Sequence, residues 1–297
     1  MRLDFFSRLM QHEQLAHPNK KQTLIMLKKR LLLPLLFFLT SQLGCAFAAD
    51  LDREKHVAES IKDSIVVGDV LMLQSNGAEF IGLVNLDHSN TNRGLVIVLH
   101  GMGSNPNAPQ IIAPLRDQLA ELGWISLAIQ LPLAPTGASI DDYLALINEA
   151  SPRIQAAVDY SRNTYPSLPC FIVAHSLGAV MATQYLSTQQ ESKCQAAVMI
   201  GLPTLASDLP EAQSLSLLEK IQLPVLDIYG SQDLASVQKT ASSRAATIME
   251  NNPLSRQVEI IGADHSFTGL DEVLIRAIHS WLSQIIEPDT QIKKTTN

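Results

Sequence analysis

The chain has 297 residues, of which 46% are hydrophobic and 17% charged, a composition that can bury a large core. This excludes a disordered protein, apart from residues 291–297, which are polar and unpatterned and where we expect a disordered tail.

The first 48 residues have the pattern of a secretory signal. Three basic residues at 28–30 precede a short apolar run over 31–39, and Ala-Phe-Ala at 46–48 fits an A-x-A cleavage site. The run is shorter than the roughly 20 apolar residues that a membrane span needs. We therefore predict export, most simply to the periplasm, with no membrane span after signal removal. An uncleaved N-terminal anchor is the alternative.

Met26 lies where such a signal begins, so residues 1–25 are expected to be an overlong gene start. Lipoprotein processing at Gly44-Cys45 is disfavoured, because Gln42 replaces the usual aliphatic residue.

The chain from 49 to 297 is predicted to be a single domain. It keeps 15 basic and 27 acidic residues, a net charge of −12, so nucleic acid is excluded as a partner.

Two cysteines, Cys170 and Cys194, remain after the signal. Each lies at or just before the start of a predicted strand. A disulfide between neighbouring strands is geometrically possible, since such strands lie about 4.8 Å apart. Two buried free thiols are the alternative, and the sequence does not choose between them.

The predicted domain begins with a helix and a hairpin. Residues 50–63 have apolar side chains at helical intervals among charged ones. Residues 70–74 and 79–85 are strand-like, and Ser75-Asn76-Gly77 joins them. Asn-Gly between two apolar runs predicts a tight turn, because both residues tolerate positive φ.

The rest of the chain alternates strands and helices. Strands are predicted at residues 95–99, 124–131, 170–174, 196–200, 225–229 and 257–261. Helices are predicted at residues 111–122, 141–165 (one or two, with Ser151-Pro152 as a helix start), 177–186, 235–250 and 270–286. This order predicts an α/β fold, with a mostly parallel sheet, an antiparallel N-terminal hairpin and helices on both faces. In such sheets the active site lies at the carboxyl ends of the strands.

A candidate nucleophile lies at one of these ends. Ala174-His175-Ser176-Leu177-Gly178 connects a buried strand directly to a helix, as in a nucleophile elbow. Ala174 departs from the G-x-S-x-G pattern by one methyl group. Ser176 is therefore the predicted nucleophile, and an ordinary helix-capping serine is the alternative.

His100-Gly101-Met102-Gly103 ends the strand at 95–99. Glycine-rich turns allow backbone N–H groups to face a substrate oxygen, so we assign the oxyanion hole to the N–H groups of Met102 and Leu177. A turn without a catalytic role is the alternative. His100 is expected to bond the loop backbone.

The predicted acid is Asp233, which follows the strand at 225–229. A carboxylate there would accept the histidine N–H and fix its tautomer. Helix capping is the alternative role for Asp233. Asp227 is the competing acid, but it lies inside the strand and is expected to face away.

The predicted base is His265, which follows the last strand. No other histidine after Ser176 lies at the carboxyl end of a strand. His175 is expected to point away from the serine hydroxyl, His279 to lie on the closing helix, and Asp264 to serve the loop.

The chain order Ser176, Asp233, His265 resembles that of the α/β-hydrolase superfamily, and the resemblance covers residues 70–286. Residues 99–103, 174–178 and 226–233 are further similar to an uncharacterised bacterial envelope-associated branch of it. The resemblance implies an α/β-hydrolase fold and a hydrolytic site, without naming a substrate.

The predicted function is that of a serine hydrolase that forms an acyl-enzyme, with a small-molecule or acyl substrate and a carboxylic ester as first choice. Residues 132–140 are expected to contribute to the pocket, and residues 201–219 to form a packed helix or a small lid. No motif indicates a metal or organic cofactor. A peptidase or amidase with the same triad, or a non-catalytic binding or envelope-assembly protein, are the alternatives.

Overall fold

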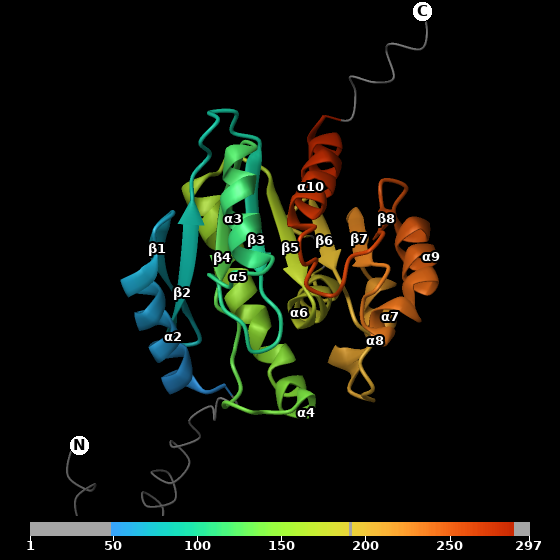
Figure 1. Ribbon diagram of the computed structural model, residues 1–297, viewed down its shortest axis with the longest axis horizontal. Helices are drawn as coiled ribbons and strands as arrows, with labels where there is room; N and C mark the ends of the chain where they lie inside the picture. The colour runs from blue at the N-terminus through green and yellow to red at the C-terminus, as the bar shows by residue number, and fades with distance from the viewer. Residues whose placement is uncertain (1–48, 190–191, 288–297) are drawn as a thin grey trace, which may run out of the picture. The chain divides into compact units, whose positions relative to one another are not determined.

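The computed structural model describes residues 49–189 and 192–287, drawn in colour in Figure 1. They belong to the unit Phe47–Asn297. The predicted signal with its start at Met26 and its cleavage site, and the predicted tail at 291–297, lie outside the described residues. Among the described residues, no helix has the length and apolarity to cross a membrane.

The described residues form one eight-stranded sheet in the order β1-β2-β4-β3-β5-β6-β7-β8. The strands are β1 (Asp69–Ser75), β2 (Ala78–Asn85), β3 (Gly94–Leu99), β4 (Trp124–Ile129), β5 (Cys170–His175), β6 (Ala196–Ile200), β7 (Val225–Gly230) and β8 (Arg256–Ile260). β1 and β2 pair antiparallel, as do β2 and β4, and every other pair is parallel. The predicted fold class is thus confirmed.

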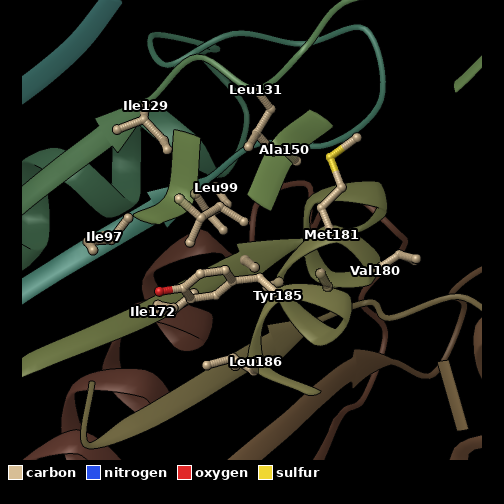
Figure 2. Packing of buried hydrophobic residues seen from close by; sticks show 14 of the residues in the cluster. Ile97, Leu99, Ile129, Leu131, Ala150, Ile172, Val180, Met181, Tyr185 and Leu186 are labelled. Carbon is tan, nitrogen blue, oxygen red and sulfur yellow. The ribbon is translucent and has the colours of Figure 1, made fainter. Parts of the chain in front are cut away.

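The helices are α2 (Leu51–Ser64), α3 (Ile112–Glu121), α4 (Ile140–Leu144), α5 (Ile147–Thr164), α6 (Leu177–Ser187), α7 (Ser214–Leu218), α8 (Ala235–Gln238), α9 (Ala241–Asn251) and α10 (Asp271–Ile286), with a 3-10 turn at Pro210–Ala212. α3 and α10 cover one face of the sheet, and α5 and α6 cover the other (Figure 1). Successive strand residues therefore face different layers. Ile97 and Leu99 lie in the cluster drawn in Figure 2 with Met181 of α6, whereas Val96 and Val98 pack toward α3 and α10.

The first hairpin turns as predicted. Asn76 (φ 51°) and Gly77 (φ 80°) both have positive φ, and Ser75 pairs with Ala78 across a two-residue loop. This is the turn that matches the twist of paired strands. α2 covers the hairpin through Ala58 and Ile61, which pack on β2.

The helical prediction at 141–165 is wrong in one detail. Two helices form, but α5 begins at Ile147, so Pro152 lies inside it rather than in its first turn. Ile147 and Ala150, in the turn before the proline, are both fully buried against the sheet. Burial of this turn outweighs the hydrogen bond that Pro152 cannot donate.

The single helix predicted at 235–250 is divided into α8 and α9. The break is at Lys239 and Thr240, where the Thr240 hydroxyl bonds the Thr204 hydroxyl (2.9 Å) and accepts from Arg244 (3.0 Å). These side-chain contacts compete with a continuous helix.

Cys170 and Cys194 form a disulfide with a Cα–Cα distance of 4.5 Å. Cys170 begins β5, and Cys194 lies just before the adjacent strand β6. Of the two alternatives that the sequence left open, the structure therefore contains the disulfide.

Candidate active site

Ser176 stands in a strained turn between β5 and α6. Its backbone has φ 55° and ψ −122°, a region that is sparsely populated for residues with a side chain. The Ser176 N–H donates to the carbonyl of Ile200 (2.9 Å), which ties the turn to the next strand. This geometry lifts the side chain above the sheet, as in a nucleophile elbow.

Two small residues make the turn possible. A Cβ at Gly178 would lie 2.3 Å from the carbonyl oxygen of His100, so no larger residue fits there without backbone movement. Ala174, the departure from the glycine pattern, is a fully buried residue of β5 paired with Leu99 and Met199. Its methyl group packs in the core cluster on the face that α5 and α6 cover, where a small side chain is accepted.

The structure brings Ser176, His265 and Asp233 together, as the sequence predicted. His265 Nε2 lies 2.8 Å from Ser176 Oγ, and His265 Nδ1 lies 2.6 Å from Asp233 Oδ1. If Nδ1–H donates to the carboxylate, Nε2 is left to accept the serine proton. Such a chain of hydrogen bonds can activate a serine hydroxyl.

Asp233 is held so that it remains ionised. Burial raises its pKa, but the hydrogen bond from His265 and the backbone N–H groups of Leu234 and Gly230 outweigh burial, so the pKa lies below its usual value. The Leu234 N–H donates to Oδ1 (2.7 Å) and the Gly230 N–H to Oδ2 (3.3 Å). Asp233 is therefore a carboxylate aimed at His265 at neutral pH.

Gly201 is a site residue that the sequence analysis missed. It follows β6 with φ 57°, and a Cβ there would lie 3.0 Å from the ring atoms Nδ1 and Cε1 of His265 and 3.3 Å from Asp233 Oδ2. The absence of a side chain lets the imidazole and the carboxylate pack over the end of β6. A glycine directly after a predicted parallel strand was the available signal.

The other histidines near the serine have structural partners. His175 Nε2 donates to the carbonyl of His265 (3.0 Å), and its ring lies 4.9 Å from the His265 ring. His100 Nδ1 donates to the carbonyl of Gly101 (2.8 Å), and its Nε2 accepts from the Leu131 N–H (3.0 Å). Burial lowers the pKa of both His100 and His175 to about 4, so both rings are neutral at pH 7.

The other acids and the histidine that the sequence analysis weighed have their own hydrogen-bond partners. Asp227 Oδ2 accepts from buried Arg244 (2.9 Å) and from Gln257 (2.7 Å), and it makes no hydrogen bond to a described histidine. Asp264 accepts from the N–H groups of Ser266 and Thr268 within its own loop. His279 lies on α10 and accepts from the Trp124 indole (3.0 Å).

Of the two residues assigned to the oxyanion hole, Met102 lines the pocket at the serine and Leu177 directly follows Ser176. Met102 follows β3 in a turn closed by the Ser104 N–H and the Gly101 carbonyl (3.3 Å), and Leu177 is the first residue of α6. Within the described ranges, neither backbone N–H donates a hydrogen bond. Both donors are thus available to a ligand, and the Leu177 N–H has the positive end of the α6 dipole behind it.

A pocket of 330 Å³ opens at the serine. It is lined by Gly101, Met102, Ser104, Ala108, Gln110, Ile111, Ile112, His175, Ser176, Leu234, His265 and Ser266. Half of its lining comes from the loop between β3 and α3. Beyond the 100–103 turn, the sequence analysis assigned this loop no binding role.

The expected pocket segment at 132–140 does not line this pocket. Leu133 and Ala134 are buried instead, because α2 holds them: the Leu133 N–H donates to Glu54 and the Ala134 carbonyl accepts from Arg53. The segment at 201–219 does not line it either. Its helix α7 packs against α6 and α9, which is the packed-helix alternative rather than a lid.

In the part of the chain that the structure describes, no group of three or more His, Cys, Asp or Glu side chains could hold a metal ion.

Comparison with known proteins shows both a family and a fold. A model described as protein of unknown function (DUF3530) matches residues 40–146 and 134–284. A search of curated proteins found no match.

Similar solved structures are α/β hydrolases. Est1E from Butyrivibrio proteoclasticus has a TM-score of 0.58 at 16% identity, over 73% of this chain and 99% of that one. XC6422 from Xanthomonas campestris, described as a serine hydrolase without lid, has a TM-score of 0.59 at 16% identity, over 74% and 96%. Dienelactone hydrolase from Anabaena variabilis has a TM-score of 0.59 at 20% identity, over 73% and 96%. At these identities the likeness shows the α/β-hydrolase fold.

Proposed function

Because the chain belongs to the DUF3530 family and has the α/β-hydrolase fold, we propose that it is a serine hydrolase that cleaves a carboxylic ester through an acyl-enzyme. The observation that carries the proposal is the hydrogen-bonded series Ser176–His265–Asp233 beneath a pocket. An ordinary capping serine would have no need of an imidazole at 2.8 Å backed by a buried carboxylate.

In the proposed reaction, Ser176 Oγ attacks the ester carbonyl while His265 Nε2 takes its proton. The N–H groups of Met102 and Leu177 stabilise the oxyanion, and Asp233 stabilises the imidazolium that forms. His265 then protonates the leaving alcohol. Water, deprotonated by the same imidazole, hydrolyses the acyl-enzyme and restores the serine.

Ester rather than amide cleavage is supported by the structural neighbours, among which are proteins named as an esterase and a dienelactone hydrolase. Amide hydrolysis with the same triad is the second candidate.

We also propose export from the cytoplasm, supported by the signal-like pattern at 28–48 and by the Cys170–Cys194 disulfide, since disulfides persist in oxidising compartments.

The test is labelling of the purified protein with a fluorophosphonate, followed by mass spectrometry to locate the adduct. We expect the adduct on Ser176 and its loss in Ser176→Ala and His265→Ala. Asp233→Asn is expected to slow ester turnover by about 10⁴-fold, because the histidine loses its tautomer control. Ser187→Ala, at the far end of α6, is the control that keeps full labelling. A folded protein that takes no label would refute an activated serine and favour a binding role.

A further inference from the structure

The pocket above Ser176 has a restricted chemistry. Its twelve lining residues include no Asp, Glu, Lys or Arg. Two titratable side chains, those of His175 and His265, line it, and each already has a protein partner. A charged substrate group placed there would lose water and gain no counter-ion, which is unfavourable.

The remaining wall is mainly apolar and without charge, with Ser104, Gln110 and Ser266 as its polar members. Met102 and Leu234 are half-exposed at the pocket, and Ala108, Ile111 and Ile112 line it with little or moderate exposure. The volume of 330 Å³ lies at the low end of the roughly 300–1,000 Å³ seen for small-molecule sites. Such a pocket suits a short apolar chain better than a polymer or a long lipid tail.

Ile111 occupies an unusual position in this wall. Its backbone has φ 60° and ψ −56°, and the Ile112 N–H donates across it to the Gln110 carbonyl (2.6 Å). This is a γ-turn with positive φ, which is rare and strained, and a β-branched residue is among the least suited to it. Glycine would satisfy this backbone without strain, yet isoleucine is present and lines the pocket.

The wall is anchored on both sides of this turn. Asn107 Oδ1 accepts from the buried guanidinium of Arg116 (3.1 Å), and the Ala113 N–H donates to the Ala108 carbonyl (2.9 Å). The strained turn is thus held by its surroundings, as strained residues at functional sites usually are.

From these observations we infer that the site takes esters of short, uncharged, apolar acyl groups, and that Ile111 is the specificity-determining residue that limits acyl length. The inference rests on the proposed function of Ser176. Ile111 lines the pocket while it is almost fully buried in the core cluster below it. A branched side chain is thus kept between pocket and core at a place where the backbone alone would favour glycine.

The test measures kcat/KM of the purified protein on p-nitrophenyl esters from acetate to decanoate. The wild type is expected to prefer a short chain and to lose about tenfold at the first chain that exceeds the pocket. Ile111→Gly and Ile111→Ala are expected to move this limit to longer chains. Leu115→Ala, on α3 directly after this turn and also buried but not lining the pocket, is the matched control and should leave the length profile unchanged.

A second probe tests the charge requirement. The p-nitrophenyl hemisuccinate and valerate esters have acyl groups of similar length, and only the first ends in a carboxylate. We expect kcat/KM on the hemisuccinate to be at least about tenfold lower, because the carboxylate finds no partner.

The outcomes separate this inference from the proposed function. If Ser176 takes the fluorophosphonate but Ile111→Gly keeps the wild-type profile, the role of Ile111 is refuted. If Ser176 is labelled but the hemisuccinate is preferred, or none of the esters is cleaved, the substrate class is refuted. If the folded wild type takes no label, the proposed function itself fails.

Discussion

At the residue scale, two histidines lie beside the proposed nucleophile without sharing its chemistry. His100 and His175 are each held by backbone groups, whereas His265 is held by a carboxylate. The hydrogen-bond partner of each histidine therefore decides whether the ring has a structural or a catalytic role. A backbone carbonyl fixes a neutral ring in place, and a carboxylate stabilises the charged ring that catalysis needs.

We predict that His100 makes the protein less stable at acid pH. Its pKa in the folded chain is about 4 and near 6.5 when unfolded, so between these values only the unfolded chain binds the proton. Protonation would also place a second donor against the Leu131 N–H. The stability that neutral His100 contributes is fully present above pH 6.5. About 3 kcal/mol of the free energy of unfolding is lost as the pH falls from 6.5 to 4. Denaturant unfolding at both pH values measures this loss.

The comparison variant is His100→Gln, in which the acid loss of stability should be smaller by about 3 kcal/mol. His56→Gln, at an exposed position on α2, is the control and should behave as the wild type. Equal acid sensitivity in wild type and His100→Gln would contradict the prediction.

At the scale of elements, α2 is attached to the loops around the site. Glu54 on α2 forms a buried ion pair with Arg153 of α5 (2.8 and 3.1 Å) and accepts from the Leu133 N–H. Arg53, one residue earlier, donates to Ala134, to the Tyr143 hydroxyl (3.3 Å) and to the Gly103 carbonyl (3.4 Å). The helix thus reaches the turn that bears the proposed oxyanion donor.

We predict that Arg53→Gln lowers kcat of ester hydrolysis by about tenfold and leaves KM nearly unchanged. The variant loosens the 101–103 turn, and small displacements of a transition-state donor slow chemistry more than they weaken binding. Steady-state kinetics well below the melting temperature is the measurement. Lys55→Gln, an exposed change on the same helix, should leave kcat as it is. A rise in KM with kcat intact would mean that Arg53 has another role.

At the scale of the whole unit, the disulfide and the proposed catalytic residues lie at opposite ends of the sheet. The disulfide joins Cys170, at the amino end of β5, to Cys194, before β6. Ser176, Asp233 and His265 follow the carboxyl ends of β5, β7 and β8. A covalent link at the first end constrains the unfolded chain without touching the site.

We predict that the double variant Cys170→Ala, Cys194→Ala is less stable than the oxidised wild type by about 3.5 kcal/mol, the loop-closure estimate for a sequence separation of 24 residues. Its kcat should be unchanged. Denaturant unfolding with and without a reducing agent measures the difference, and the reducing agent should have no effect on the double variant. If it does not destabilise the wild type, the disulfide contributes nothing to stability.

Much of the fold and the three proposed triad residues could be predicted from sequence because their signals are local. Five aliphatic residues in a row at 95–99, the Asn76-Gly77 pair and the serine between a strand and a helix each predict structure over a few residues. Parallel sheets then collect the ends of distant strands at one edge. Ser176, Asp233 and His265 therefore met as expected.

Features that depend on packing between distant segments were missed or left open. Pro152 lies inside a helix because the turn before it is buried, and Gly201 matters because an imidazole packs over it. The sequence by itself determined the fold class, the order of the strands along the chain and the triad candidates, because these follow from local pattern. The tertiary structure alone decided the pocket wall with Ile111, the attachment of α2 and the disulfide, because each depends on distances between segments that sequence pattern does not encode.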